Sequence, residues 1–411
     1  MELPALGQQT AETHLYNTML ERLMLFRHNA PNDVWILMEQ QTCSKRQRQE
    51  IVKCVFGPAL IGSGTIVRMP FAAADSPTVP IKNVILPKKL EHKNNMRPSC
   101  LNISEAMNSS SNPFVSVIIP VCDDLRRLKI CLEALENQTY PTHSYEVLVV
   151  NNNTAKDIEP DIVSFNHVRV ICERRRGSYA ARNKGILNAR GTVLAFTDSD
   201  CIPREDWIEK GVKNLLSRHN MGLVAGRIDI IVADPDKPTA IEIYEKITAF
   251  QQKFYIEHSK FGATANLFTF KNIVEDVGNF DDSLMSSGDV EWCNRVFAAG
   301  HTQMYADDTC ILHPARKTFS EKFRKSVRII KGKHALGLLD CSSRTFMKRL
   351  IWPVMEAGDI LSKGKHSAHL KGKKQKLKFI VALFFDSYVW AFGSLVVAVF
   401  GRTGRKKLKI H

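Results

Sequence analysis

Two aspartates, Asp198 and Asp200, stand one residue apart after an apolar run, in the segment AFTDSDC. Carboxylates in such a position either cap the segment that follows or bind a cation. Mg²⁺ and Mn²⁺ take oxygen ligands, and Mg²⁺ commonly takes one or two carboxylates together with substrate phosphates. The sequence contains no GxxxxGK[ST] loop, so a metal held by these acids would be the means of neutralising a bound diphosphate.

A second acidic pair, Asp289 and Glu291, follows two serines and a glycine in the segment SSGDVEWCNRVFAAG. The spacing predicts a helix that ends at Gly300 and carries both acids in its first turn. Acids there complement the helix dipole, which is a sufficient structural reason for their presence. A carboxylate at a cleft edge could also act as a general base toward a substrate hydroxyl. The two roles are compatible, because a helix start holds a side chain rigidly.

Two other segments carry side chains that bind metals or anions. His313 follows the apolar run of ADDTCILHPAR, where it is either structural or a third metal ligand or phosphate contact. The segment RRRGSYAARNKG, residues 174–185, holds four arginines and a lysine. These form either a solvated helix face or a surface that attracts an anionic donor. Arg182 and Asn183 lie among small residues and are harder to explain as a solvated face.

The elements that must position these residues alternate between strand and helix patterns. Short apolar runs predict strands, and runs with helical spacing separate two pairs of them. The strands are expected at 114–121, 145–153, 168–173 and 192–196, and the helices at 123–138 and 177–190. This alternation predicts an α/β fold, a mostly parallel sheet with helices on both faces. Ligands of such sheets bind at the carboxyl ends of the strands, where Asp198 and Asp200 fall.

The chain divides into four parts by composition. Residues 1–90 alternate weakly, with an amphipathic helix expected at 12–28 and a strand at 32–39. Residues 91–113 are Ser/Asn-rich and read as a linker. The α/β pattern occupies 114–335, and a basic helical tail follows at 336–411.

Charge and cysteines indicate the compartment and the partners. The chain has 57 Lys and Arg against 42 Asp and Glu, a net charge of +15. Residues 342–411 hold 15 of the basic residues and three acids, hence +12, which leaves +3 for the rest. A basic tail on a nearly neutral body favours anionic lipid over nucleic acid as a partner. The ten cysteines are scattered without CxxC spacing and no secretory signal is visible, which predicts reduced thiols and a cytosolic location.

The tail contains an apolar segment of 22 residues, 379–400. As a helix it would reach about 33 Å, just enough to cross a bilayer core. Asp386 interrupts it and both flanks are basic, so charge bias selects no orientation for a span. A helix in the membrane interface, or a re-entrant one, fits both basic flanks best, with a single span or a buried core helix as alternatives.

The order of the motifs resembles that of family 2 glycosyltransferases with the GT-A fold. VSVIIPVCDD, EVLVVNNN, GSYAARNKGI, GTVLAFTDSDC, TANLFTFKNIVEDVGNFDDSL and SGDVEWCNRVFAAGH occur in that order over about 114–335. The resemblance implies a nucleotide-sugar donor, with a UDP-sugar as the first choice, and a Mg²⁺ or Mn²⁺ cofactor. Where the family usually has an acid directly before the base, this chain has Gly288.

Site residues follow from the resemblance position by position. It implies that Asp289 is the catalytic base, that Asn266 and Glu291 meet the acceptor, and that Asp198, Asp200 and His313 bind the metal. In the family, the second strand usually ends in aspartates that contact the nucleotide base of the donor. This chain has asparagines at those positions. The positions expected along the donor are Pro120, Val121, Asn151, Asn152, Arg182, Asn183, Asp198 and Ser199.

The expected reaction is a metal-dependent glycosyl transfer with inversion to a saccharide or lipid-linked acceptor, in polysaccharide or glycan biosynthesis. The expected location is the cytoplasmic face of the cell membrane, peripheral or monotopic. A processive polysaccharide synthase is disfavoured, because its QxxRW motif and several spans are not seen. A non-catalytic scaffold with a decayed domain is disfavoured by the retained Asp198, Asp200 and Asp289.

Overall fold

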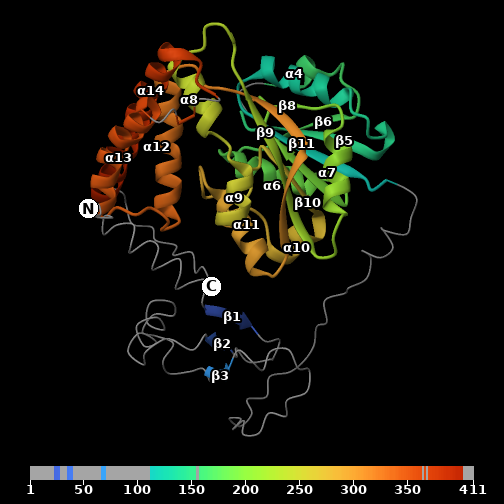
Figure 1. Cartoon of the computed structure of the whole chain (residues 1–411). Coiled ribbons are helices and arrows are strands. Elements are labelled where there is room, and N and C mark those ends of the chain that lie inside the picture. Colours follow the sequence, from blue (N-terminus) through green and yellow to red (C-terminus); the bar gives the residue numbers. More distant parts are fainter. Residues whose placement is uncertain are drawn as a thin grey trace, which may run out of the picture. The chain divides into compact units, whose positions relative to one another are not determined.

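The computed structural model describes residues 23–27, 35–39, 66–70, 112–153, 157–362, 365–366 and 369–400. The chain forms two compact units, Met1–Arg97 and Pro98–His411 (Figure 1). The second unit contains the α/β sheet and the C-terminal helices. The expected linker at 91–113 lies outside the described residues except for its last two positions.

The first unit contains a three-stranded sheet of β1 (Leu23–Arg27), β2 (Trp35–Glu39) and β3 (Ile66–Pro70). β1 pairs antiparallel with β2, and β3 pairs parallel with β2. The strand expected at 32–39 is confirmed as β2. The helix expected at 12–28 is wrong at Leu23–Arg27, because these residues find strand partners in β2, and periodicity within one segment does not report such pairing.

The second unit is built on an eight-stranded mixed sheet in the order β6-β5-β4-β7-β10-β9-β11-β8. Strands β6, β5, β4 and β7 are parallel. β10 runs antiparallel to both β7 and β9, while β11 is parallel to β9 and antiparallel to β8. The strands are β4 (Val115–Val121), β5 (Tyr145–Asn151), β6 (Val168–Cys172), β7 (Val193–Thr197), β8 (Ile202–Pro203), β9 (Met221–Ile231), β10 (Asn266–Phe270) and β11 (Thr302–Pro314). The predicted α/β class is confirmed, and the four expected strands are β4 to β7.

Helices cover both faces of this sheet (Figure 1). Side chains of α4 (Leu125–Glu136) and α7 (Trp207–Leu215) join one buried apolar cluster, and those of α6 (Ser178–Asn188), α10 (Lys271–Val277) and α11 (Gly288–Ala298) join the other. Neighbouring residues of β4 alternate between the two clusters: Val117 and Ile119 belong to the first and Ile118 to the second. This period of two is what a strand buried on both faces requires. Shorter elements complete the layers: η3 (Thr142–Ser144), α5 (Glu159–Ile162), α8 (Ala240–Thr248) and α9 (Gln252–Ser259).

Three helices form a separate layer beside the sheet: α12 (Phe319–Ala335), α13 (Ser343–Ser362) and α14 (Gly372–Phe400) (Figure 1). α14 packs against α8, α12 and α13. Its buried residues recur every three or four positions, as one face of a helix requires: Phe379, Ala382, Leu383, Asp386, Ser387, Ala391 and Ser394. The tail is therefore attached to the α/β domain along one face of α14.

Asp386, the charge that interrupts the apolar segment, is satisfied inside this helical layer. Its Oδ2 lies 3.1 Å from Nζ of Lys322 and accepts a 3.0 Å hydrogen bond from the Tyr244 hydroxyl. Its Oδ1 accepts a 2.7 Å hydrogen bond from the Ser326 hydroxyl. A buried carboxylate needs a cation and hydrogen-bond donors to offset its desolvation, and Asp386 of α14 receives them from α12 and α8.

Candidate active site

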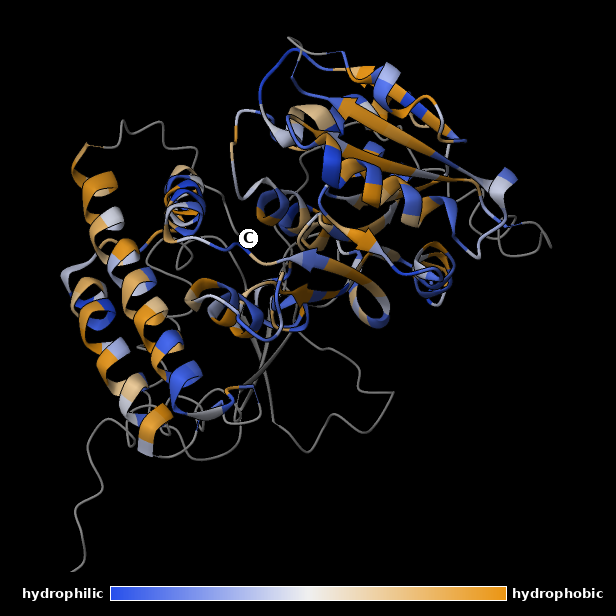
Figure 2. Cartoon of the chain, turned by 90° about the horizontal axis from the view of Figure 1, so that it is seen from above, coloured by the Kyte–Doolittle hydropathy of each residue, from blue (hydrophilic) through white to orange (hydrophobic). Residues whose placement is uncertain are grey.

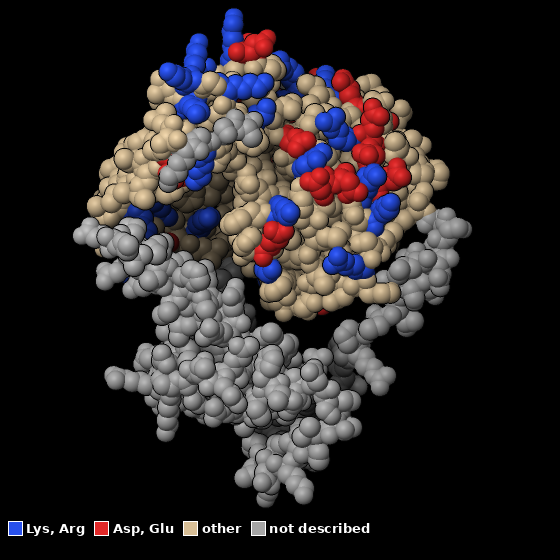
Figure 3. Space-filling view, viewed as in Figure 1, with Lys and Arg blue, Asp and Glu red and all other residues tan. Residues whose placement is uncertain are grey.

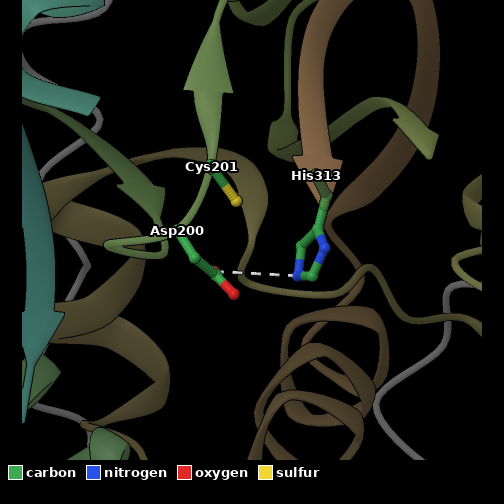
Figure 4. A group of neighbouring side chains, drawn as sticks. All are labelled: Asp200, Cys201 and His313. Atoms are coloured by element: carbon green, nitrogen blue, oxygen red, sulfur yellow. Dashed lines mark ion pairs between the residues drawn. The ribbon is translucent and has the colours of Figure 1, made fainter. Parts of the chain in front are cut away.

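Strand register brings Asp200 and His313 together from distant parts of the chain. β8 pairs antiparallel with the end of β11, with Leu312 opposite Ile202. The residues just before β8 therefore lie beside the residue after Leu312. Oδ1 of Asp200 lies 3.7 Å from Nε2 of His313 (Figure 4). Donor atoms of Asp200, Cys201 and His313 all lie within 4.8 Å of one another, which makes this the candidate metal position.

The hydrogen bonds of His313 suit a metal ligand. Its Nδ1 lies 2.8 Å from the carbonyl oxygen of Pro314. A carbonyl only accepts, so Nδ1 carries the proton and Nε2 of the neutral ring presents a lone pair toward Asp200. Two acceptors facing each other require either a cation between them or a protonated ring. Carboxylates suit Mg²⁺ and Mn²⁺, and a neutral imidazole is a common metal ligand, so the residues present fit a divalent cation.

Cys201 belongs to the same group of three side chains but is a poor metal ligand. Burial raises the pKa of its thiol well above the ordinary value, and the negative charges of Asp198 and Asp200 raise it further. Metal ligation requires the thiolate. Burial likewise raises the pKa of Cys131, whose Sγ lies 3.9 Å from the carbonyl oxygen of Asp198. The thiols of Cys131 and Cys201 therefore stay protonated and neutral beside Asp198 and Asp200.

Two arginines neutralise the acidic pair. Nη2 of Arg182 lies 2.5 Å from Oδ1 of Asp198, and the Arg182 side chain is only 4% exposed. Its Nε is buried without a hydrogen-bond partner in the described part of the chain. Nη1 of Arg127 lies 3.8 Å from Oδ2 of Asp200. A buried donor left over beside two carboxylates is a place for a phosphate oxygen.

Asp289 lies in the first turn of α11, near enough to Arg182 to feel its charge. Its Oδ1 accepts hydrogen bonds from the backbone N–H of Val290, at 2.9 Å, and from the Tyr179 hydroxyl, at 3.2 Å. Burial raises the pKa of Asp289, and the Val290 N–H, the charge of Arg182 and the Tyr179 hydroxyl oppose that rise. A carboxyl with a raised pKa is a better proton acceptor at neutral pH than an ordinary aspartate.

Tyr179 occupies the space beside Asp289 that Gly288 leaves open. A Cβ at position 288 would lie 2.7 to 2.9 Å from atoms of the Tyr179 ring. The guanidinium of Arg182 lies 5.6 Å from the centre of the same ring. Tyr179 therefore contacts both the expected base and the arginine that binds Asp198. The sequence analysis missed Tyr179, although its position one helical turn before Arg182 places both on one face of α6.

The structure also places Pro120, Val121, Asn151 and Ser199 at or after carboxyl ends of strands. Val121 pairs with Asn151 at the ends of β4 and β5. Ser199 lies in the turn between Asp198 and Asp200, after the end of β7. Their expected contacts with the donor remain predictions.

Two of the asparagines expected along the donor are committed to the backbone instead. The side chain of Asn183 donates to the carbonyl of Phe280 and accepts from its N–H. The amide of Asn152 donates to the carbonyls of Glu173 and Arg175 and accepts from the N–H of Gly177. The expected donor contacts of these two amides stay predictions, because both side chains already hydrogen-bond the backbone in this structure. Both support the segments around α6, a role that a sequence motif does not distinguish from ligand binding.

The two residues expected at the acceptor are also occupied internally. Asn266 is fully buried, accepts from Nε1 of Trp207 and donates to the carbonyls of Arg227 and Thr309. Both oxygens of Glu291 bind the guanidinium of Arg295, at 2.7 and 2.9 Å. An acceptor cannot reach the Asn266 amide, and Glu291 is paired within its own helix. Their expected contacts with the acceptor stay predictions, since each position was chosen by its place in a motif and each side chain is engaged within the protein here.

A family model, curated relatives and a solved structure match parts of this chain. A model described as glycosyl transferase family 2 matches residues 116–278. The glycosyltransferase AglE of Haloferax volcanii is 39% identical over 250 residues, which are 59% of this chain and 81% of the relative. The dolichyl N-acetyl-alpha-D-glucosaminyl phosphate 3-beta-D-2,3-diacetamido-2,3-dideoxy-beta-D-glucuronosyltransferase of Methanococcus voltae is 23% identical over 226 residues, 52% of this chain and 70% of the relative. The solved mannosyltransferase PcManGT from Pyrobaculum calidifontis, in complex with GDP-Man and Mn²⁺, aligns with 70% of this chain and 88% of its own, at a TM-score of 0.48 and 16% identity.

Proposed function

This chain belongs to glycosyltransferase family 2 and is a glycosyltransferase, and we propose that it uses a divalent metal ion and Asp289 to transfer a sugar with inversion. The donor is a nucleoside diphosphate sugar and the acceptor is a hydroxyl of a saccharide or lipid-linked saccharide. The observation that carries the proposal is the position of Arg182, which binds Asp198 and is close enough to Asp289 to lower its pKa. Arg182 thus connects the expected diphosphate side with the expected base.

Each residue has a separate task in this mechanism. Asp200 and His313 would hold the metal, which stabilises negative charge on the departing diphosphate when it is bound. The guanidinium of Arg182 offers its unpaired Nε to a phosphate oxygen. Asp289 accepts the proton of the acceptor hydroxyl as that oxygen attacks the anomeric carbon. Attack from the face opposite the leaving group inverts that carbon.

The proposed nucleotide is UDP, as expected from the sequence, and a panel of donors tests it. A lipid-linked acceptor has support from the Methanococcus voltae relative, whose name gives a dolichyl-linked sugar phosphate as its substrate. The exposed apolar face of the C-terminal helices suits such an acceptor, because it could meet the membrane that carries the lipid.

We further propose that α14 lies in the membrane interface and does not cross the bilayer. α14 is long and apolar enough for a span, but one face is docked on α12, whose segment FSEKFRKSVRIIKGKHA is rich in lysine and arginine. A crossing α14 would draw these charges toward the hydrocarbon, which is costly. The opposite face of α14 exposes apolar side chains, and Figure 2 shows orange residues along these helices. This placement supports a monotopic enzyme, and the location we propose for it is the cytoplasmic face of the membrane.

Donor turnover tests the proposed reaction. Release of nucleoside diphosphate would be measured for a panel of nucleotide sugars, with Mn²⁺, Mg²⁺ or a chelator, in wild type and in Asp289→Asn. Removal of the base should lower kcat by about 10²- to 10⁴-fold and leave donor binding intact. Glu275→Gln, an exposed carboxylate on α10, is the matched control and should retain wild-type turnover. A wild type as inert as Asp289→Asn across the whole panel would favour the scaffold alternative.

A further inference from the structure

Two cations converge on one tryptophan where α12, α13 and α14 meet. Nζ of Lys333 lies 5.4 Å from the centre of the Trp390 ring, and the guanidinium carbon of Arg349 lies 5.7 Å from the same centre. The three residues come from α12, α13 and α14 in that order. Nη1 of Arg349 also donates a 2.6 Å hydrogen bond to the Ser394 hydroxyl, which fixes the guanidinium against α14.

No carboxylate lies within 4.0 Å of Lys333 or Arg349 in the described residues, in contrast to Lys322 and Lys325 on the same helix α12. Burial lowers the pKa of Lys333, and the charge of Arg349 lowers it further. Asp340, the acid that acts on Arg349, is exposed and accepts hydrogen bonds from the Ser342 N–H and the Thr345 hydroxyl. The Trp390 ring attracts each cation but does not remove the repulsion between them. An anion would.

The surroundings of this pair are apolar and exposed. The rings of Phe346 and Phe392 meet edge to face at 5.7 Å on the helices that carry Arg349 and Trp390. Phe392 is 53% exposed, and Met347 and Leu395 are 50% and 47% exposed. Cations beside an exposed apolar surface match a molecule with an anionic head and an apolar chain. Free phosphate would contact the two cations but leave the exposed apolar surface uncovered.

Lys333 directly follows the residue at which α12 touches the start of α11. Gly332 precedes Lys333, and a Cβ at Gly332 would lie 2.6 Å from the carbonyl oxygen of Ser286 and 2.9 Å from the Ser287 hydroxyl. Ser287 is the N-cap of α11, which carries Asp289 in its first turn. The space-filling view shows a hollow between the α12–α14 layer and the sheet, with basic side chains in its wall (Figure 3). A molecule held at Lys333 and Arg349 could thus extend a sugar toward Asp289.

We propose that Lys333, Arg349 and Trp390 bind the phosphate or diphosphate head of an amphiphilic acceptor, whose apolar chain lies over Phe392 and Met347. This site rests on the proposed function, because it names the class of acceptor that the transferase uses. Two half-buried cations and the hydroxyl of Ser394 supply the donors that phosphate oxygens accept. The sugar to be extended would lie between this site and Asp289.

Binding of farnesyl phosphate in neutral detergent micelles tests the site without donor, metal or turnover. Its failure is therefore distinguishable from failure of the proposed reaction. Titration calorimetry of the full chain would compare farnesyl phosphate, farnesol in the same micelles, and inorganic pyrophosphate. Wild type should bind farnesyl phosphate at least about tenfold more tightly than either of the others. Equal affinity for pyrophosphate would overturn the amphiphile, and equal affinity for farnesol would overturn the phosphate site.

The variant Lys333→Gln/Arg349→Gln should lose about tenfold or more in affinity, since each charged hydrogen bond contributes strongly. Lys331→Gln/Lys348→Gln removes the same charge from exposed neighbours on the same two helices and should bind as wild type does. An equal loss in both variants would indicate diffuse attraction and overturn the site, as would no loss in the first. Arg349→Lys keeps the charge but removes the planar guanidinium that can bind two oxygens at once, so it replaces the double variant if that variant does not fold. Its affinity for farnesyl phosphate should fall between those of wild type and the double variant. An unchanged affinity would contradict the site.

Discussion

The Tyr179 hydroxyl donates a 3.2 Å hydrogen bond to Oδ1 of Asp289, and the two residues are 110 positions apart in the chain. Tyr179 reaches this oxygen because Gly288 has no side chain in its path. Burial raises the pKa of Tyr179 beyond its ordinary value, so the hydroxyl stays protonated and acts only as a donor. Tyr179 is therefore a positioning residue for the expected base, and it also affects the pH at which that base is ionised.

Tyr179→Phe should move the acidic limb of the pH–rate profile to higher pH. The base acts in its deprotonated form, so activity rises as pH passes through the pKa of Asp289. Burial has already raised that pKa, and the Tyr179 hydroxyl lowers it. Loss of the hydroxyl therefore raises it further, and kcat/KM falls most at low pH. The measurement is kcat/KM across pH for wild type and variant.

Tyr305→Phe is the matched control for this substitution. It removes a hydroxyl that donates to Asp307, at 2.7 Å, away from the proposed base. Its pH profile should overlay that of wild type. A Tyr179→Phe profile lowered equally at every pH would show that Tyr179 only supports the fold.

Metal binding should depend on Asp200 and His313 but not on Cys201. Asp200→Asn and His313→Gln each remove one proposed ligand and should weaken Mn²⁺ binding at least tenfold, measured by calorimetry. Cys201→Ala should bind Mn²⁺ within about twofold of wild type, because a buried neutral thiol is no ligand. Loss of binding in Cys201→Ala with retention in His313→Gln would contradict this ligand set.

The strands and helices that depend on local sequence patterns could be predicted from the sequence. β4, β5 and β7 are short apolar runs buried on both faces, and Asp124 caps α4 by accepting from the N–H of Arg127. The pairing of β10 between β7 and β9 could not be predicted, because antiparallel register depends on partners far along the chain. The pairing of β8 with β11, which brings His313 beside Asp200, likewise depends on partners far apart in the chain.

The site shows a similar division. Acids at strand and helix ends were identifiable, because charge at such positions needs a reason. The roles of the asparagines could not be identified in the same way. Asn152, Asn183 and Asn266 hydrogen-bond backbone groups, and an amide does this as readily as it contacts a ligand. Tyr179 was missed because a buried tyrosine in a helix usually reports packing.

Gly332→Ala should lower both stability and activity, whereas Gly358→Ala should not. A Cβ at Gly332 would come within 2.6 Å of the Ser286 carbonyl oxygen, and Ser287 beside it already has a φ of 65°. The turn that starts α11 must then shift, which displaces Asp289 and lowers kcat. At Gly358 a Cβ meets nothing within 4 Å, so alanine should stabilise α13 by up to about 1 kcal/mol. Denaturant unfolding and kcat of both variants check this, and unchanged kcat in Gly332→Ala would contradict it.

Charges on the exposed face of α14 should release the enzyme from membranes without stopping catalysis. Leu395 and Val399 are 47% and 64% exposed and lie one helical turn apart, so Leu395→Glu/Val399→Glu places two carboxylates on the proposed membrane face. Sedimentation with anionic vesicles should fall about tenfold or more, because each charge is costly in the bilayer and is repelled by its surface. Leu187→Glu, at a side chain 76% exposed on α6, should leave sedimentation unchanged. Turnover of a water-soluble acceptor should survive in both variants, since neither position contacts the proposed metal or base. Vesicle binding that persists in the double variant would show that another surface carries the attachment.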